Sequence, residues 1–356
     1  MWKDTVVSRR LKLDAPIIQG PFGGGLSSVD LVVAVSESGG LGSFGAHHLG
    51  GAGIRDVAAS IRARTARPFA LNLWIPLGDS DDPRMTDTQW QAAIELVRPY
   101  YQQLGVPIPA RPERFAPRYE EQIETVLELR PAVFSFVFGV PSADVLDRCR
   151  SAGINTLGAA TTPAEAKLLA EAGVDMIVAT GFEAGGHRVS FLSEPEDCLT
   201  GTLSLVPQVV DTVRVPVIAA GGIADGRGIA AALALGAAAA QIGTAFLACE
   251  ESNAAPAHRA KLFSTDARRT TLTRAFSGRL ARSVHNDFID AFRGKERALA
   301  PYPVQGWLNA QIRAAALAAG RTDIISLWSG QSAPLLKHRR AAELMRWLID
   351  HAGNVS

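Results

Sequence analysis

Short apolar runs alternate with segments whose apolar residues recur at helical spacing, and this alternation constrains the fold more than any other feature. The runs occupy residues 15–20, 41–45, 69–74, 132–139, 155–160, 175–180, 216–220 and 238–243. Such alternation is typical of repeated βα units that build a parallel sheet. There are eight runs, and eight strands close a (β/α)₈ barrel. We therefore predict an α/β chain with a TIM-barrel fold.

An open, doubly wound sheet that binds a dinucleotide is the alternative architecture. Its first turn would need the spacing G-x-G-x-x-G, and the turn at 20–25 reads GPFGGG. No acidic residue closes the second run, where a ribose would need one. The number of runs and the absence of this motif favour the barrel.

Two segments leave the alternation. Residues 75–118 hold a helical pattern near 88–104 and a proline-rich return, which is too long for an ordinary βα loop. Residues 251–356 are mainly helical in pattern, and 270–276 favour a strand. We predict a barrel domain from residues 1–74 and 119–250. The insertion 75–118 and the segment 251–356 would form a smaller helical cap above the active site.

Composition limits the partners of the chain. The formal net charge is +1 and no basic tract occurs, so neither nucleic acid nor a membrane surface is an expected partner. The three cysteines, Cys149, Cys198 and Cys249, suggest no disulfide framework and no metal pair, which fits a reducing compartment. No leader peptide or membrane span is recognisable. We expect a cytoplasmic protein without a bound metal, and its oligomeric state is not predicted.

Two glycine-rich turns follow the last two apolar runs. They read PVIAAGG at 216–222 and QIGT at 241–244, so Gly221, Gly222 and Gly243 fall at the carboxyl ends of adjacent strands. Backbone N–H groups there, beside a helix N-terminus, favour a phosphate, and barrels commonly place a phosphate site at this position. The alternative interpretation is that these are ordinary tight-turn glycines.

The motif GFEAGGHR at 181–188 follows the sixth run. Gly185 and Gly186 let the backbone approach a flat ligand and direct His187 into the barrel mouth. Histidine titrates near neutrality, which suits abstraction of a weakly acidic proton from carbon. The alternative is a loop histidine that merely hydrogen-bonds to its neighbours.

Two features carry a weaker indication. Asn72 is polar within an apolar run, so its amide needs a buried partner. A flavin ring edge would provide one, as would a water or a neighbouring strand. The turn that contains Pro21, Phe22 and Gly23 could lie against a planar ring or could be a flexible turn.

At these residues the chain resembles the nitronate monooxygenase family, formerly called 2-nitropropane dioxygenases. The resemblance runs from APIIQGPFGGG through ALNLW, GFEAGGHR, AAGGIADG and QIGTAFLACEES to SGRLAR, PYPVQ and LWSGQ. It implies non-covalently bound FMN, and oxidation of alkyl nitronates or nitroalkanes by O₂ to carbonyl compounds and nitrite. His187 matches the catalytic base of the family.

The resemblance also implies roles for other residues. Residues that match or adjoin flavin contacts are Pro21, Phe22, Gly23, Asn72, Thr180, Gly185, Gly186, Gly221, Gly222, Gly243, Thr244 and Gln331. Ser277 and Tyr302 fall in segments that contribute to the substrate pocket. Phe22 stands where relatives usually have methionine, Val189 where they have glycine, and Thr180 where some have glutamine. These departures bear on the substrate more than on FMN.

Three other functions remain open from the residues alone. An FMN-dependent NAD(P)H reductase, acting on enoyl thioesters or quinones, would use the same cofactor site. A non-redox phosphate-binding barrel enzyme would use only the glycine turns. A non-enzymatic binding module is least favoured, because the candidate base and the phosphate turns converge on one barrel face.

Overall fold

The computed structural model describes residues 2–77, 83 and 85–354, so part of the insertion lies outside the described residues. Eight parallel strands form one sheet in the order β1-β9-β8-β6-β5-β4-β3-β2. They are β1 (Ile17–Gln19), β2 (Gly42–Gly45), β3 (Phe69–Trp74), β4 (Val133–Val137), β5 (Asn155–Ala160), β6 (Met176–Thr180), β8 (Val217–Ala220) and β9 (Ala239–Ile242). The two edges meet where Gln19 N–H donates to the carbonyl of Leu41 at 2.9 Å, and Leu41 N–H donates to that of Ile17 at 3.0 Å. The predicted barrel is confirmed.

Helices surround the strands, as the periodicity predicts. They are α2 (Val29–Glu37), α3 (Gly51–Arg62), α5 (Tyr119–Leu129), α6 (Ala143–Ser151), α7 (Pro163–Glu171), α8 (Thr202–Thr212) and α9 (Gly226–Ala234). Successive strand residues face opposite sides of the sheet, so Ile17 packs outward in the core that includes the helices, while Ile18 packs in the barrel interior. The short helix α1 (Val6–Leu11), which we did not predict, adds Val7 and Leu11 to the interior cluster.

The C-terminal part adds helices and a small sheet. The helices are α10 (Thr244–Leu247), α11 (Pro256–Leu262), α12 (Asp287–Phe292), α13 (Val304–Ala318) and α14 (Ala341–Gly353), with 3₁₀ turns at Pro195–Asp197, Thr265–Arg268, Glu296–Ala298, Thr322–Ile324 and Ala333–Leu335. The antiparallel sheet has the order β10-β11-β7, with β10 (Thr270–Thr273), β11 (Ala281–Val284) and β7 (Gly186–His187). The strand predicted near 270–276 is therefore present. The strands β7 and β11 were not predicted, because they are short and pair across a long sequence separation.

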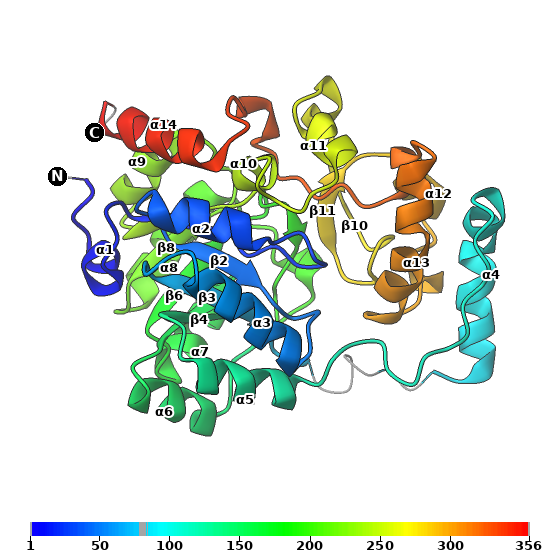
Figure 1. Ribbon diagram of the computed structural model, residues 1–356, viewed down its shortest axis with the longest axis horizontal. Helices are drawn as coiled ribbons and strands as arrows, with labels where there is room; N and C mark the ends of the chain where they lie inside the picture. The colour runs from blue at the N-terminus through cyan, green and yellow to red at the C-terminus, as the bar shows by residue number, and fades with distance from the viewer. Residues whose placement is uncertain (1, 78–82, 84, 355–356) are drawn as a thin grey trace.

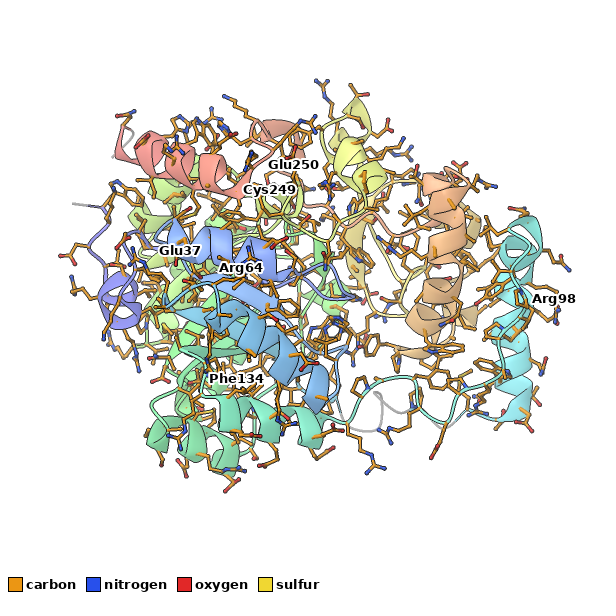
Figure 2. All side chains as sticks on the ribbon, viewed as in Figure 1. Glu37, Arg64, Arg98, Phe134, Cys249 and Glu250 are labelled. Atoms are coloured by element: carbon orange, nitrogen blue, oxygen red, sulfur yellow. The ribbon has the colours of Figure 1, made fainter. Side chains whose placement is uncertain are left out.

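Helix α4 (Asp87–Gln103), from the insertion, packs on α13. Tyr101 Oη donates to the carbonyl of Leu308 at 2.7 Å, and the rings of Trp90 and Trp307 lie 6.2 Å apart. Figure 1 shows α4, α12 and α13 together at one side of the barrel, and Figure 2 shows Arg98 there and Phe134 among the barrel elements. These contacts support the proposed cap.

The last helix, α14, lies on the barrel. Helix α14 packs against α2 and α9 of the barrel, where Gly226 N–H donates to Nδ1 of His351 at 3.2 Å. The division into two domains stays a prediction, with α14 placed on the barrel side. Among the described residues, no helix combines the length and the apolar character that a bilayer crossing requires.

Candidate active site

A cavity of about 480 Å³ opens at the carboxyl ends of the barrel strands, where barrel enzymes place their active sites. Fourteen of the fifteen residues singled out from the sequence line it: Pro21, Phe22, Gly23, Asn72, Thr180, Gly185, Gly186, His187, Gly221, Gly222, Gly243, Thr244, Ser277 and Tyr302. Gln331 does not line it. Its side chain is exposed, and its backbone N–H donates to the carbonyl of Glu183 at 2.9 Å. The neighbours Gly330 and Ser332 face the cavity instead.

The glycine-rich turns after β8 and β9 differ in what a side chain at their glycines would meet. Gly221 has a φ of 105°, and a Cβ there would stand 2.9 Å from Thr202 Oγ1 and 3.0 Å from the carbonyl of Gly181. A Cβ on Gly243 would meet only the ring edge of Phe22, at 4.0 Å. The fold therefore fixes Gly221, whereas Gly243 leaves open a space that belongs to the cavity.

The helices after these turns also differ. The N-terminus of α9 is capped by Asp225, whose Oδ1 accepts from the N–H groups of Arg227 and Gly228 at 3.0 and 3.2 Å. This acidic cap satisfies two of the amides at the start of α9 within the protein. The contribution of α9 to a phosphate site stays a prediction. Helix α10 begins at Thr244, on the cavity wall, and Thr244 Oγ1 accepts from Gly330 N–H at 2.8 Å.

His187 is held in a sheet and not in a free loop. It pairs with Ala281 of β11, and the next residue, Arg188, donates its N–H to the carbonyl of Leu280 at 2.8 Å. The buried Arg188 guanidinium donates to the carbonyls of Thr180, Gly181 and Cys198 at 2.8–3.1 Å. These bonds fix the backbone on both sides of the histidine.

The His187 ring sits among aromatic side chains. Its Nε2 lies 2.8 Å from Ser277 Oγ, and its ring centre lies 5.0 Å from that of Trp74 and 5.3 Å from that of Trp328. Burial, and then the charge of Arg279, lower the pKa of His187 to about 3. The imidazole is therefore neutral at neutral pH, with one ring nitrogen able to accept a proton.

Tyr302 faces the same space. Its ring centre lies 5.5 Å from that of Trp74, and the Arg279 guanidinium carbon stands 3.9 Å above it. The same guanidinium lies 4.4 Å from the ring centre of Phe138. Arg279 was not predicted as a site residue, although it lies within the SGRLAR motif. Its stacking on two rings places a positive charge beside the histidine.

Asn72 finds its buried partner on the next strand, where its Nδ2 donates to Ser135 Oγ at 3.0 Å. The neighbouring-strand alternative is thus the one that the structure contains, while Asn72 still lines the cavity. Thr180 ends β6, and its carbonyl accepts from Arg188.

Two further histidines, His47 and His48, also line the cavity and were not predicted. His47 stacks on Trp74 with ring centres 3.9 Å apart, and burial, followed by the charge of His48, lowers the pKa of His47 well below its ordinary value. A Cβ on Gly23 would stand 2.7 Å from the His47 ring. The His-His pair after the second apolar run was the available signal.

Comparisons with known proteins show which family the chain is similar to. The family model described as nitronate monooxygenase matches residues 5–351. A probable nitronate monooxygenase of Staphylococcus aureus is 37% identical over 356 residues, covering 100% of this chain and 99% of the relative. One of Staphylococcus haemolyticus is 36% identical, covering 98% and 97%.

Two solved structures are similar over nearly the whole chain. A nitroalkane oxidase from Streptomyces ansochromogenes has a TM-score of 0.88 at 36% identity, covering 98% of each chain. FabK from Thermotoga maritima has a TM-score of 0.75 at 26% identity, covering 99% of this chain and 96% of that one.

Proposed function

Because the chain belongs to the nitronate monooxygenase family, we propose that it is an FMN-dependent enzyme that oxidises alkyl nitronates with O₂ to carbonyl compounds and nitrite. A neutral nitroalkane would be a second substrate once its α-carbon is deprotonated. One observation carries the proposal. A neutral histidine and the glycine turns of β8 and β9 line a single cavity at the carboxyl end of the barrel.

The residues on the cavity wall fit FMN. The volume of about 480 Å³ is within the range of about 300–1,000 Å³ of small-molecule sites. The space that a Cβ on Gly243 would enter suits a phosphate close to the backbone. We propose that Gly221, Gly222, Gly243 and Thr244 hold the phosphate, with Asn72 and the turn at 21–23 beside the ring. FMN, when bound, supplies the electron transfer between nitronate and O₂.

His187 is the proposed base. In its neutral form it can accept the α-proton of a nitroalkane. Ser277 Oγ lies 2.8 Å from Nε2 and 3.2 Å from the carbonyl of Arg279. After proton transfer, Nε2–H can donate to Ser277 Oγ while the hydroxyl donates to that carbonyl. The imidazolium would thus keep a hydrogen-bond partner.

The walls beside His187 suit an anionic substrate. Trp74 and Trp328 exclude water from the space next to the ring, which strengthens electrostatic interactions there. Arg279, stacked on Tyr302, contributes a positive charge toward a nitronate. The proposed role of Tyr302 is a hydrogen bond to a nitro oxygen.

An anaerobic reduction experiment tests the function. The purified holoprotein is mixed without oxygen with propionate 3-nitronate, an alkyl nitronate, NADH or NADPH, and the visible flavin absorbance is followed. We expect the nitronates to bleach it rapidly, and nitrite to appear when O₂ is admitted. Rapid bleaching by NADH or NADPH alone would favour the reductase instead. A colourless protein that takes up no FMN would favour a non-redox barrel enzyme.

A further inference from the structure

The cavity extends from His187 along one face of helix α13. Pro303 stands at the start of this helix, and Gly306, Asn309 and Arg313 follow it on the cavity wall. These positions recur every three or four residues, so they share one helical face. With a rise of about 1.5 Å per residue, Arg313 lies roughly 15 Å from Pro303 along the helix axis. The space is therefore longer than a small nitronate requires.

Beside the α13 face, which includes the polar Asn309, one wall between the two ends is apolar. The Trp328 ring lies 5.3 Å from that of His187 and 5.7 Å from that of Phe276. Ile324 and Ile325 continue this wall toward Arg313. A hydrocarbon chain that spans the cavity would meet aromatic and aliphatic side chains along this wall, which favours its transfer from water.

The Arg313 guanidinium, which has no ion pair among the described residues, stands at the far end. Arg313 Nη1 donates to the carbonyl and to Oγ of Ser326, at 3.3 and 3.2 Å. Burial lowers the pKa of Arg313. Within the part of the chain that the structure describes, no ion pair includes Arg313, and its Nε and Nη2 have no hydrogen-bond partner. A partly desolvated cation of this kind favours an incoming anion.

We propose that Arg313 and Ser326 form a subsite for the carboxylate of an elongated substrate whose nitronate carbon reacts beside His187. This deepens the proposed function and rests on it. The planar guanidinium fork suits a carboxylate, which can accept two parallel N–H bonds. Arg313 is the only Lys or Arg among the described residues that line the cavity, so it provides a single positive charge for a single carboxylate. The substrate class is a straight-chain nitronate with a carboxyl group at its other end.

Chain length provides the first test. The holoenzyme is assayed with ω-carboxyl alkyl nitronates that begin with propionate 3-nitronate and lengthen one methylene at a time. Each is paired with the unsubstituted alkyl nitronate of equal length. We expect the carboxyl group to raise kcat/KM only above a threshold length, where it reaches Arg313. A carboxyl group that gives no advantage at any length would overturn the subsite, and this result needs no variant.

Arg313→Gln provides the second test. For the long carboxylated substrate, kcat/KM should fall roughly ten- to hundredfold, the usual effect of losing a charged hydrogen bond. The unsubstituted nitronate and the FMN content should be unchanged. Arg313→Lys should recover part of the loss, because it retains the charge but not the fork. Arg98→Gln on the outer helix α4, where Arg98 pairs with Glu95, is the matched control. Equal losses on both substrates would show that Arg313 only supports the fold.

A binding measurement separates this proposal from the proposed function. Calorimetry of the holoenzyme with octanoate and with octanol requires no turnover. Binding of octanoate that is tighter than that of octanol and is lost in Arg313→Gln supports the subsite even if no nitronate is oxidised. Turnover of alkyl nitronates without any preference for octanoate over octanol would support the function and overturn the subsite.

Discussion

The two ends of the cavity differ in whether backbone or side-chain atoms form their walls. The end at β8 and β9 is mainly backbone, because Gly221, Gly222 and Gly243 provide no side chains and only Thr244 adds a hydroxyl to the proposed phosphate contacts. The end around His187 is made of side chains from distant segments, including Trp74 of β3 and Trp328 near the C-terminus. A backbone site is fixed once its turn is fixed, whereas a side-chain site depends on every segment that reaches it. Substitutions at the backbone end should therefore weaken cofactor binding, whereas substitutions at the side-chain end should reduce activity.

The largest expected effect is at the side-chain end. His187→Asn should retain FMN but lose about 10²- to 10⁴-fold in kcat/KM on a neutral nitroalkane, the usual contribution of a positioned base. Activity on the preformed nitronate should fall less, because no proton needs to be removed. Steady-state kinetics on both substrates, with flavin spectra as the control for cofactor content, measure this. Small and equal losses on the two substrates would remove His187 from the role of base.

At the backbone end, the effect should be on cofactor affinity. Gly243→Val should fold, since its Cβ meets only the Phe22 ring edge, at 4.0 Å, but should bind FMN at least about tenfold more weakly. Titration of the apoprotein with FMN, followed by flavin fluorescence, gives the Kd. Unchanged affinity would contradict the assignment of this turn to the phosphate.

Two further glycines control that experiment. Gly221→Val should reduce the melting temperature itself, because its Cβ would stand 2.9 Å from Thr202 Oγ1 in a left-handed conformation. Gly50 precedes α3 and does not line the cavity, so Gly50→Val should leave FMN affinity unchanged. A loss of affinity in Gly50→Val would indicate a general disturbance of the barrel.

The contrast between the backbone end and the side-chain end also explains which features the sequence could predict. The eight apolar runs, the glycine turns and GFEAGGHR are local patterns, and the structure places them as expected. Arg279 and Trp328 lie in the motifs SGRLAR and LWSGQ, but they reach the site through the pairing of β7 with β11 and the packing of the segment after α13, and neither motif encodes these long-range contacts. Gln331 does not line the cavity. A motif identifies a segment and not the direction of each side chain, and the assignment of Gln331 to the cofactor stays a prediction. Its neighbours face the cavity while it faces solvent.

A smaller effect is expected at Tyr302. Tyr302→Phe removes one hydroxyl and leaves the ring between Trp74 and Arg279, so packing should be retained. If the hydroxyl donates to a nitro oxygen, KM for a nitronate should rise roughly two- to tenfold, the effect of one hydrogen bond. FMN content and melting temperature are the controls. Unchanged KM and kcat would mean that Tyr302 contributes only to packing.

The smallest expected effect is that of pH, on which kcat/KM for a neutral nitroalkane should depend only weakly. The pKa of His187 is lowered to about 3, so the neutral, proton-accepting form persists as pH falls and is lost only near that value. For an unperturbed histidine, with a pKa near 6.5, the neutral fraction would instead fall about 30-fold between pH 8 and pH 5. Because kcat/KM reports the free holoenzyme, its value for a neutral nitroalkane should change less than about twofold over this interval. Released FMN, measured by fluorescence at each pH, corrects for cofactor loss. If kcat/KM instead falls at low pH with a midpoint near 6.5, and this fall is absent in His187→Asn, water reaches the imidazole. In that case the aromatic wall of Trp74 and Trp328 would not isolate this end of the cavity from solvent.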